Sequence, residues 1–489
     1  MWLCLGLYAA QVILLCTVAL RDVKLPMRSL AWIVIGLCIP FLGFAVYYIL
    51  NGPLPERPEP RRQGSRSDVN ANSLPAHTTS AATIHRVVQS ITHVPAVEAR
   101  IRLFHDGNST YAALLQALSS ARHTIDLEFY IFRDDHIGRR IMQLLCQRAK
   151  EGVKIRFLRD GMGSRKLPPS TVARMQSHGI ECRTFFPVRF PWLTRRLNHR
   201  DHGKIVVIDK HIGFVGGINV GDEYTGRKPG VGPWRDTHVQ LLGDRAIQAL
   251  QSIFDMNWAI ATLDRGQLNR VPPRTRGVVK TRQPVPSYAG EWAEELTAWP
   301  AHGADWTQGF VQAIESGPDR RMQSIRNLFF TGLTQANASV DITTPYFVPD
   351  TDVLTAIKTA VLKGVVVRLL VPEQPDHKAV GLASRTFYKE LLDVGVQIYL
   401  YTGGILHAKV MTIDDDVSIL GAANYDLRSF RTNYEVCQVV YCPDVASELR
   451  RQFEQDLQHS FPLTTEWLQK PPPWHQGAQR IARLFAPLL

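Results

Sequence analysis

Two apolar stretches open the chain. Residues 2–20 and 30–50 contain no charged side chain, and each is about long enough to cross a ~30 Å hydrocarbon core as a helix. A cleaved signal peptide is the alternative for the first stretch, but that stretch lacks a basic start and a small-residue cleavage site. Basic residues after each stretch nearly balance in number, so the pattern predicts no orientation. We expect residues 1–50 to form a transmembrane hairpin of two helices.

The rest of the chain alternates between strand-like and helix-like patterns. Residues 51–82 are rich in Pro, Arg, Ser and Asn and lack apolar periodicity, which is typical of a flexible linker. A strand–helix–glycine–strand phrase then occurs at 124–158 and again at 339–371. A repeat of roughly 200 residues is too long for a solenoid and indicates duplicated α/β domains, each a mixed sheet flanked by helices. We expect a first domain at 83–265, a connection at 266–310 and a second domain at 311–489.

One part of the repeat matches position by position. HGKIVVIDKHIGFVGGIN begins at His202, and HAKVMTIDDDVSILGAAN begins at His407. A single H-x-K-x4-D pattern is weak evidence, but two copies with the same following Gly and Asn make coincidence a poor explanation. The matching pairs, each 205 residues apart, are His202/His407, Lys204/Lys409, Asp209/Asp414, Gly216/Gly421 and Asn219/Asn424.

The repeated residue types suit chemistry on a phosphodiester. Alternate residues of a strand face the same way, so His202 and Lys204 should project together, as should their counterparts in the second copy. Lysine and asparagine side chains can donate hydrogen bonds to non-bridging phosphate oxygens. Two histidines suit a two-step displacement, in which one attacks phosphorus and the other exchanges protons with the leaving and incoming oxygens.

Each histidine needs a partner that fixes its tautomer. Asp236 follows His202 by 34 residues and Glu435 follows His407 by 28, and both lie in strand-like runs. We expect each acid to orient the histidine of its own half.

The motif aspartates differ from the other repeated residues in their distance from the histidines. Asp209 and Asp414 fall one strand length, about 16 Å, from the histidines, so a turn or ion-pair role is at least as well supported as direct chemistry. A lysine beside each histidine opposes metal binding, and no acidic cluster accompanies the pair. The sequence therefore predicts neither a metal nor a cofactor.

The amino-acid composition limits the kinds of molecule that the protein is expected to bind. The chain has 489 residues, a formal charge of +12 and a mean hydropathy of −0.10, which excludes a protein embedded through most of its length. Such a charge favours an anionic partner, either nucleic acid or acidic lipid headgroups, and the apolar stretches favour lipid. Seven cysteines without metal-ligand spacing support neither a disulfide framework nor a zinc site.

The doubled motif with its G-x-x-N continuation resembles the phospholipase D superfamily. The phrases YIFRDDHIG, GVGPWRD, TPYFVPD and NYDLRSF, and the C-terminal SFPLTTEW, are similar to bacterial cardiolipin synthases over nearly the whole chain. The resemblance implies paired α/β domains with the site between them. It also implies joining of two phosphatidylglycerols into cardiolipin and glycerol, at the inner membrane of a bacterial cell and without nucleic acid. The oligomeric state is not predicted.

The resemblance assigns roles to eight residues and leaves rivals open. Catalytic roles fall to the histidines, lysines and aspartates of both motifs, and phosphate binding falls to Asn219 and Asn424. Gly203 replaces a usual basic residue, and Gly217 and Ala422 stand where a small hydroxyl residue is common. A hydrolytic phospholipase D or a superfamily nuclease would keep the same residues. A non-enzymatic membrane scaffold would not need both motifs, and the aspartate-rich signature of CDP-alcohol synthases is absent.

Overall fold

The structure is a computed structural model. It describes residues 2–21, 26–39, 41–43, 47, 79–188, 198–227, 232–266, 305–320, 322–469 and 482–483. Residues 51–78 of the expected linker and 267–304 of the expected connection lie outside this described part.

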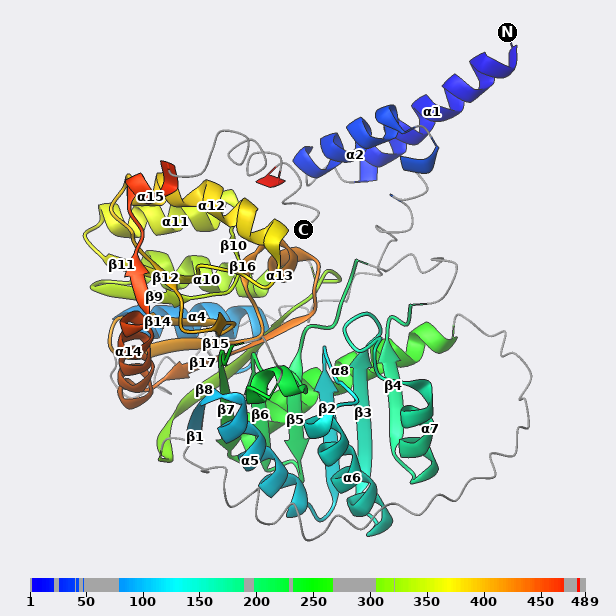
Figure 1. The fold of residues 1–489 in the computed structure, drawn as a ribbon, viewed down its shortest axis with the longest axis vertical. Coiled ribbons are helices and arrows are strands. Elements are labelled where there is room, and N and C mark those ends of the chain that lie inside the picture. The colour runs from blue at the N-terminus through cyan, green and yellow to red at the C-terminus, as the bar shows by residue number, and fades with distance from the viewer. Residues whose placement is uncertain are drawn as a thin grey trace.

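A mixed sheet of 16 strands, flanked by helices, runs through both halves of the molecule (Figure 1). The first half contains β1 (Val97–Asp106), α5 (Gly107–Ser119), β2 (Thr124–Phe129), α6 (His136–Lys150), β3 (Lys154–Asp160), α7 (Pro169–Ser177), β4 (Glu181–Phe185), β5 (Lys204–Ile208), β6 (Ile212–Gly216), the 3-10 turn Asp222–Thr225, β7 (Trp234–Leu242) and α8 (Asp244–Gly266).

The second half repeats this plan and adds short elements. It contains β8 (Thr307–Ser316), α10 (Ser324–Gln335), β9 (Ser339–Thr343), β10 (Phe347–Val348), α11 (Thr351–Leu362), β11 (Val366–Pro372), α12 (Lys378–Leu392), β12 (Gln397–Tyr401), β13 (Ile405–Leu406), β14 (Val410–Ile413), β15 (Val417–Gly421), β16 (Tyr425–Asp426), α13 (Leu427–Arg431), β17 (Glu435–Tyr441), α14 (Pro443–Gln458), β18 (Ser460–Pro462) and α15 (Thr465–Gln469).

Strand order confirms the duplication. From the centre outward the first half runs β1-β7-β6-β5-β2-β3-β4, and the second runs β8-β17-β15-β14-β9-β11-β12 before ending at β18. The halves join where β1 pairs antiparallel with β8, with Val97 opposite Val311. The expected α/β fold with two similar domains is therefore correct.

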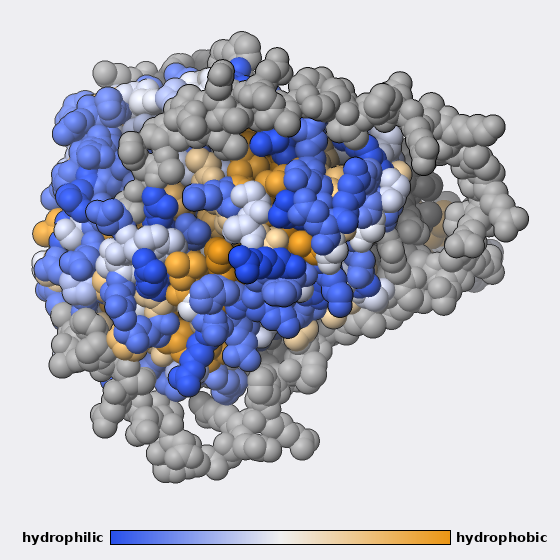
Figure 2. Space-filling view, turned by 90° about the horizontal axis from the view of Figure 1, so that it is seen from below, coloured by the Kyte–Doolittle hydropathy of each residue, from blue (hydrophilic) through white to orange (hydrophobic). Residues whose placement is uncertain are grey.

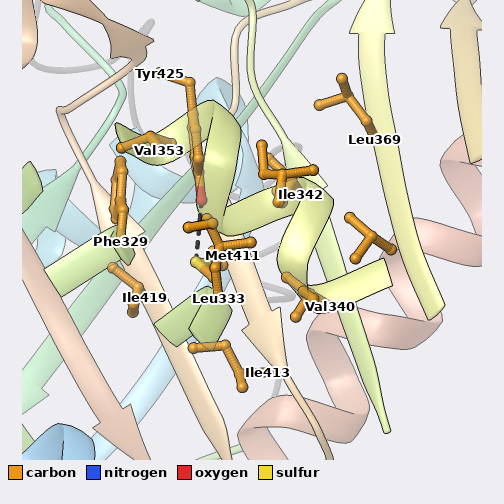
Figure 3. Close-up of a cluster of buried hydrophobic side chains, with 14 of the residues drawn as sticks. Phe329, Leu333, Val340, Ile342, Val353, Leu369, Met411, Ile413, Ile419 and Tyr425 are labelled. Atoms are coloured by element: carbon orange, nitrogen blue, oxygen red, sulfur yellow. Dashed lines mark hydrogen bonds between the residues drawn. The ribbon is translucent and has the colours of Figure 1, made fainter. Parts of the chain in front are cut away.

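Apolar residues on both faces of the sheet explain why it is covered by helices. In the second half, α10 places Phe329 and Leu333 against side chains of β9, β14 and β15 (Figure 3). Tyr425 joins this core, and its hydroxyl donates to the sulfur of Met411 at 3.0 Å. Burying each large aliphatic or aromatic side chain contributes about 1.5–3 kcal/mol, so this cluster stabilises the half strongly. The outer face seen in Figure 2 is mostly hydrophilic, with small apolar areas between polar residues.

The N-terminal region forms α1 (Trp2–Arg21) and α2 (Pro26–Cys38), which lie side by side (Figure 1). Both fall on the two apolar stretches, although α2 ends well before residue 50. Within the described residues, no helix meets the length and hydropathy needed to span a membrane.

Helix α4 (Thr79–Thr92) links the start of the first half to the second half. Its buried residues Ala81, Ile84 and Val88 belong to the same core as α10, and Ser80 Oγ donates to Asp414 Oδ2 at 3.1 Å. The expected domain start at residue 83 falls inside this helix. The segment before β1 thus packs on the opposite half of the molecule.

Candidate active site

Both motif histidines line one cleft of about 730 Å³, to which each half contributes side chains. Asn219 and Asn424 line the same cleft. The sequence therefore identified four residues that the fold brings together from positions more than 200 residues apart.

The histidine–acid pairs cross between the halves. His202 Nδ1 lies 2.9 Å from Glu435 Oε2, and His407 Nδ1 lies 2.6 Å from Asp236 Oδ2. The expectation that each acid serves the histidine of its own half is wrong. Each motif is bonded through its backbone to the other half, because the His202 amide donates to the Tyr434 carbonyl and the His407 amide to the Arg235 carbonyl, both at 2.8 Å.

Both acids are buried, and neighbouring groups favour their ionised form. Burial raises the pKa of Glu435, but its electrostatic interaction and hydrogen bond with His202 outweigh burial and leave that pKa lowered. Glu435 Oε1 also accepts from Ser429 Oγ at 2.9 Å and from Asn433 Nδ2 at 3.1 Å. Burial likewise opposes ionisation of Asp236, and the charge of Lys409 and the interaction with His407 lower its pKa.

The histidines are neutral in this arrangement. Burial lowers the pKa of His202 to about 4 despite the opposing pull of Glu435. Burial, followed by the charge of Lys409, lowers the pKa of His407 as well. Because Nδ1–H donates to an ionised carboxylate in each pair, Nε2 keeps its lone pair. Either ring could therefore act as a nucleophile or a base.

The two lysines lie beneath the histidines. Lys204 Nζ donates to the His202 carbonyl at 2.5 Å, and Lys409 Nζ donates to the His407 carbonyl and lies 2.8 Å from His407 Nδ1. Burial lowers the pKa of Lys204 to about 7 and that of Lys409 to about 8. Strand β5 begins at Lys204 and β14 at Val410, so the histidines precede the strands instead of alternating within them.

The asparagines differ in how they are held. Asn219 Oδ1 accepts from the Ile131 amide at 3.1 Å, and its Nδ2 donates to the Tyr224 hydroxyl at 2.9 Å. The Tyr111 hydroxyl also donates to the Asn219 carbonyl at 2.5 Å. Asn424 is 4% exposed, and its Oδ1 has no hydrogen-bond partner among the described residues. Sequence reasoning missed both tyrosines, because no spacing rule connects them to the motif.

The motif aspartates lie at turns away from the cleft. Asp209 accepts from the amides of Arg122, His123 and Thr124 at 2.7–2.8 Å. Asp414 accepts in the same way from the amides of residues 337–339. Both adopt positive φ, 51° and 48°, a conformation in which aspartate is tolerated better than most residues. They fix the connection to β2 and β9, and the structure places neither beside the histidines.

Two glycines that depart from the family pattern make room for acids. A Cβ at Gly203 would lie 2.2 Å from Glu128 Oε1, and one at Gly217 would lie 2.1 Å from Asp236 Oδ1. A hydroxyl side chain at 217 is therefore incompatible with the position of Asp236. Glycine at these two positions therefore leaves space for the carboxylates of Glu128 and Asp236.

Glu128 belongs to a buried acidic network that the sequence did not reveal. Glu128, Asp160 and Asp201 are each 0% exposed and lie directly behind the first motif. Asn257 Nδ2 donates to Glu128 at 3.0 Å, the Gly203 amide donates to Asp201 at 3.1 Å, and Arg200 lies 3.7 Å from Asp160. Among the described residues, no group of three or more His, Cys, Asp or Glu side chains could hold a metal ion.

Comparisons with known proteins agree with this geometry. A family model described as "Cardiolipin synthase, PLD-like domain" matches residues 114–258 and 330–457. A cardiolipin synthase of Halalkalibacterium halodurans is 36% identical over 95% of this chain and 89% of the relative. Cardiolipin synthase 2 of Bacillus anthracis is 41% identical over 79% of this chain and 70% of the relative.

A solved structure shares the fold. The crystal structure of a phosphatidylserine synthase from Haemophilus influenzae superposes with a TM-score of 0.60 and 15% identity, covering 83% of this chain and 98% of that one. The paired phospholipase D-like domains, the doubled motif in one cleft and the similarity to curated relatives over most of the chain together show that this chain belongs to the cardiolipin synthase family.

Proposed function

We propose that the chain is a phosphatidyltransferase that joins two phosphatidylglycerols into cardiolipin and releases glycerol. The observation that carries this proposal is the pair of histidines in one cleft, each with its Nδ1 on a buried carboxylate. Such a pair can divide a phosphodiester exchange into two displacements.

In the first displacement, Nε2 of one histidine attacks the phosphorus of a phosphatidylglycerol. The nitrogen–phosphorus bond forms as the phosphorus–oxygen bond to glycerol breaks, and the other histidine gives its proton to the leaving oxygen. An entering phosphodiester anion raises the pKa of that second imidazole, which offsets the effect of burial. In the second displacement this histidine takes the proton of an acceptor hydroxyl, whose oxygen attacks phosphorus and releases the first histidine.

The remaining motif residues supply hydrogen bonds and charge. Lys204 and Lys409, with Asn219 and Asn424, can donate to the phosphoryl oxygens as charge develops on them. One phosphodiester is exchanged for another of similar energy, so we propose that neither CTP nor a divalent metal is needed. Asp236 and Glu435 orient the histidines, and Asp209 and Asp414 support the motifs from their turns.

We further propose that the enzyme works at an anionic membrane surface, namely the inner membrane of a bacterial cell. The uncharged stretches at 2–20 and 30–50 and the formal charge of +12 support a multi-pass anchor and attraction to acidic lipid. Nucleic acid is not a proposed partner.

Purified full-length protein incubated with phosphatidylglycerol vesicles tests the activity. We expect cardiolipin and glycerol in equal amounts, unaffected by a chelator, and no cleavage of single-stranded DNA. Phosphatidic acid as the main product would indicate a hydrolytic phospholipase D. Loss of activity in the chelator, restored by one metal, would contradict the metal-free mechanism.

Variants of the motif test the assigned chemistry. His202→Ala and His407→Ala should each abolish transfer, and Lys204→Ala or Lys409→Ala should lower kcat about 10²–10³-fold, since each removes a preorganised donor. Thermal melting of each variant controls for folding. A near-wild-type rate in a folded lysine variant would show that the reaction does not use that lysine.

A further inference from the structure

The cleft carries more positive charge than one reacting phosphodiester explains. Arg165, Lys166, Lys378 and Arg428 line it together with the two histidines. Among the described residues, none of these four has a carboxylate at ion-pairing distance. Two other cleft arginines do: Arg133 lies 2.6 Å from Glu223, and Arg200 lies 3.7 Å from Asp160.

These cations come from both halves. Arg165 and Lys166 lie between β3 and α7, and Lys378 begins α12 after the equivalent strand β11. All three are exposed, whereas Lys204 and Lys409 are buried beneath the histidines. Two separate sets of basic side chains therefore surround the histidines: a buried lysine pair that does not line the cleft, and an exposed set at the cleft rim.

The acids of the cleft offset only part of the charge of the rim, because Asp376 and Asp426 are two carboxylates against the four cations. Asp376 accepts from the Tyr346 hydroxyl at 2.6 Å and from the His377 amide at 3.0 Å. Asp426 caps α13 by accepting from the Ser429 amide at 2.7 Å, and Glu223 is paired with Arg133. The rim thus presents positive charge to whatever enters the cleft.

We propose that Arg165, Lys166 and Lys378, with Arg428, form a second phosphodiester site that holds the phosphate of the acceptor lipid. This inference rests on the proposed function. The product contains two phosphodiesters joined by one glycerol, so the acceptor must place its own phosphate one glycerol away from the reacting phosphorus. A cleft of about 730 Å³ has room for both groups.

The second site also accounts for transfer in preference to hydrolysis. Water and neutral alcohols have no anionic group that the rim cations could bind, whereas phosphatidylglycerol has a phosphate. Holding the acceptor hydroxyl next to the intermediate raises its effective concentration over that of water.

A partition experiment tests the site. Wild-type protein in nonionic detergent micelles containing phosphatidylglycerol and ethanol yields cardiolipin, phosphatidylethanol and phosphatidic acid from one donor. We expect Arg165→Gln, Lys166→Gln and Lys378→Gln each to lower the ratio of cardiolipin to phosphatidylethanol about two- to fivefold, which is the range for exposed ion pairs. The triple variant should lower the ratio by tenfold or more. The ratio does not depend on how much of the protein is folded.

The control is Lys154→Gln, an exposed lysine at the far end of β3 from the cleft loop, which should leave the ratio unchanged. An unchanged ratio in the triple variant would overturn the inference. A wild-type protein that forms no cardiolipin would instead refute the proposed function.

Discussion

At the residue scale, each motif histidine is oriented by a carboxylate from the opposite half of the molecule. Glu435→Gln should remove the ionised acceptor of His202 Nδ1 and lower kcat by about 10²-fold or more, since losing the carboxylate of such a pair misorients the ring. Nitrogen-15 NMR of the imidazoles should show the tautomer of His202 change while that of His407 stays. Asp236→Asn is the matched control and should do the reverse. A change confined to His407 in the Glu435 variant would contradict the crossed pairing.

The acidic network behind the first motif predicts a pH dependence of stability. Burial and the nearby charge of Asp160 raise the pKa of Asp201 from 3.8 to about 7. The folded state therefore holds a proton that the unfolded state has lost, and the contribution to the free energy of unfolding decreases as pH rises from about 4 to 7.

Asp201→Asn should reduce this decrease by at most about 1.4 kcal/mol per pH unit within that window, while Glu128, whose pKa is also raised by burial, keeps its own contribution. Urea unfolding of both proteins between pH 5 and 8 measures it, and Asp444→Asn on the exposed start of α14 is the control. Equal pH slopes for wild type and Asp201→Asn would show that Asp201 is ionised throughout.

At the element scale, the aspartates join strand ends to their neighbours. Asp209→Asn keeps a residue that tolerates positive φ but loses charge on a group bonded to three amides, so we expect a loss of about 1–3 kcal/mol of stability. Thermal and urea unfolding measure the loss. Specific activity of the folded fraction should remain within a few-fold of wild type, and a fully stable but inactive variant would contradict the turn role.

Strand spacing explains what could be predicted about these elements. The distance of one strand between His202 and Asp209 follows from local geometry, so the separation of the aspartates from the histidines could be predicted. The pairing of acids could not, because it depends on contacts such as β13 with β7 that join residues about 170 positions apart. Arg165 and Lys166 reach the cleft from a loop, and Lys378 and Tyr224 from the start of α12 and a 3-10 turn, none of which belongs to the repeated motif.

At the scale of the whole molecule, the two halves share the same strand order, but the side chains behind the two motifs differ. Strand order is repeated, and this could be predicted because two copies of one phrase must fold alike. The packing of α4 on the second half could not, since its apolar face is compatible with either half. Thr343 and Leu406 stand at the positions equivalent to Glu128 and Asp201, so within the described residues this acidic network is not repeated behind His407.

The different surroundings of His202 and His407 help to decide which histidine carries the phosphatidyl group. A phosphorylated imidazole that keeps its Nδ1 proton is cationic. Lys409 Nζ lies 2.8 Å from Nδ1 of His407, so it partly offsets the Asp236 carboxylate 2.6 Å away and disfavours a lasting positive charge there. His202 Nδ1 faces Glu435, which two further donors hold in place. We therefore predict that His202 is the nucleophile and His407 the acid and base. Trapping labelled phosphatidylglycerol by rapid acid-free denaturation should place the label on the peptide containing His202. Label on the His407 peptide would reverse the assignment, whereas no labelled peptide together with inversion at phosphorus would indicate direct transfer between lipids.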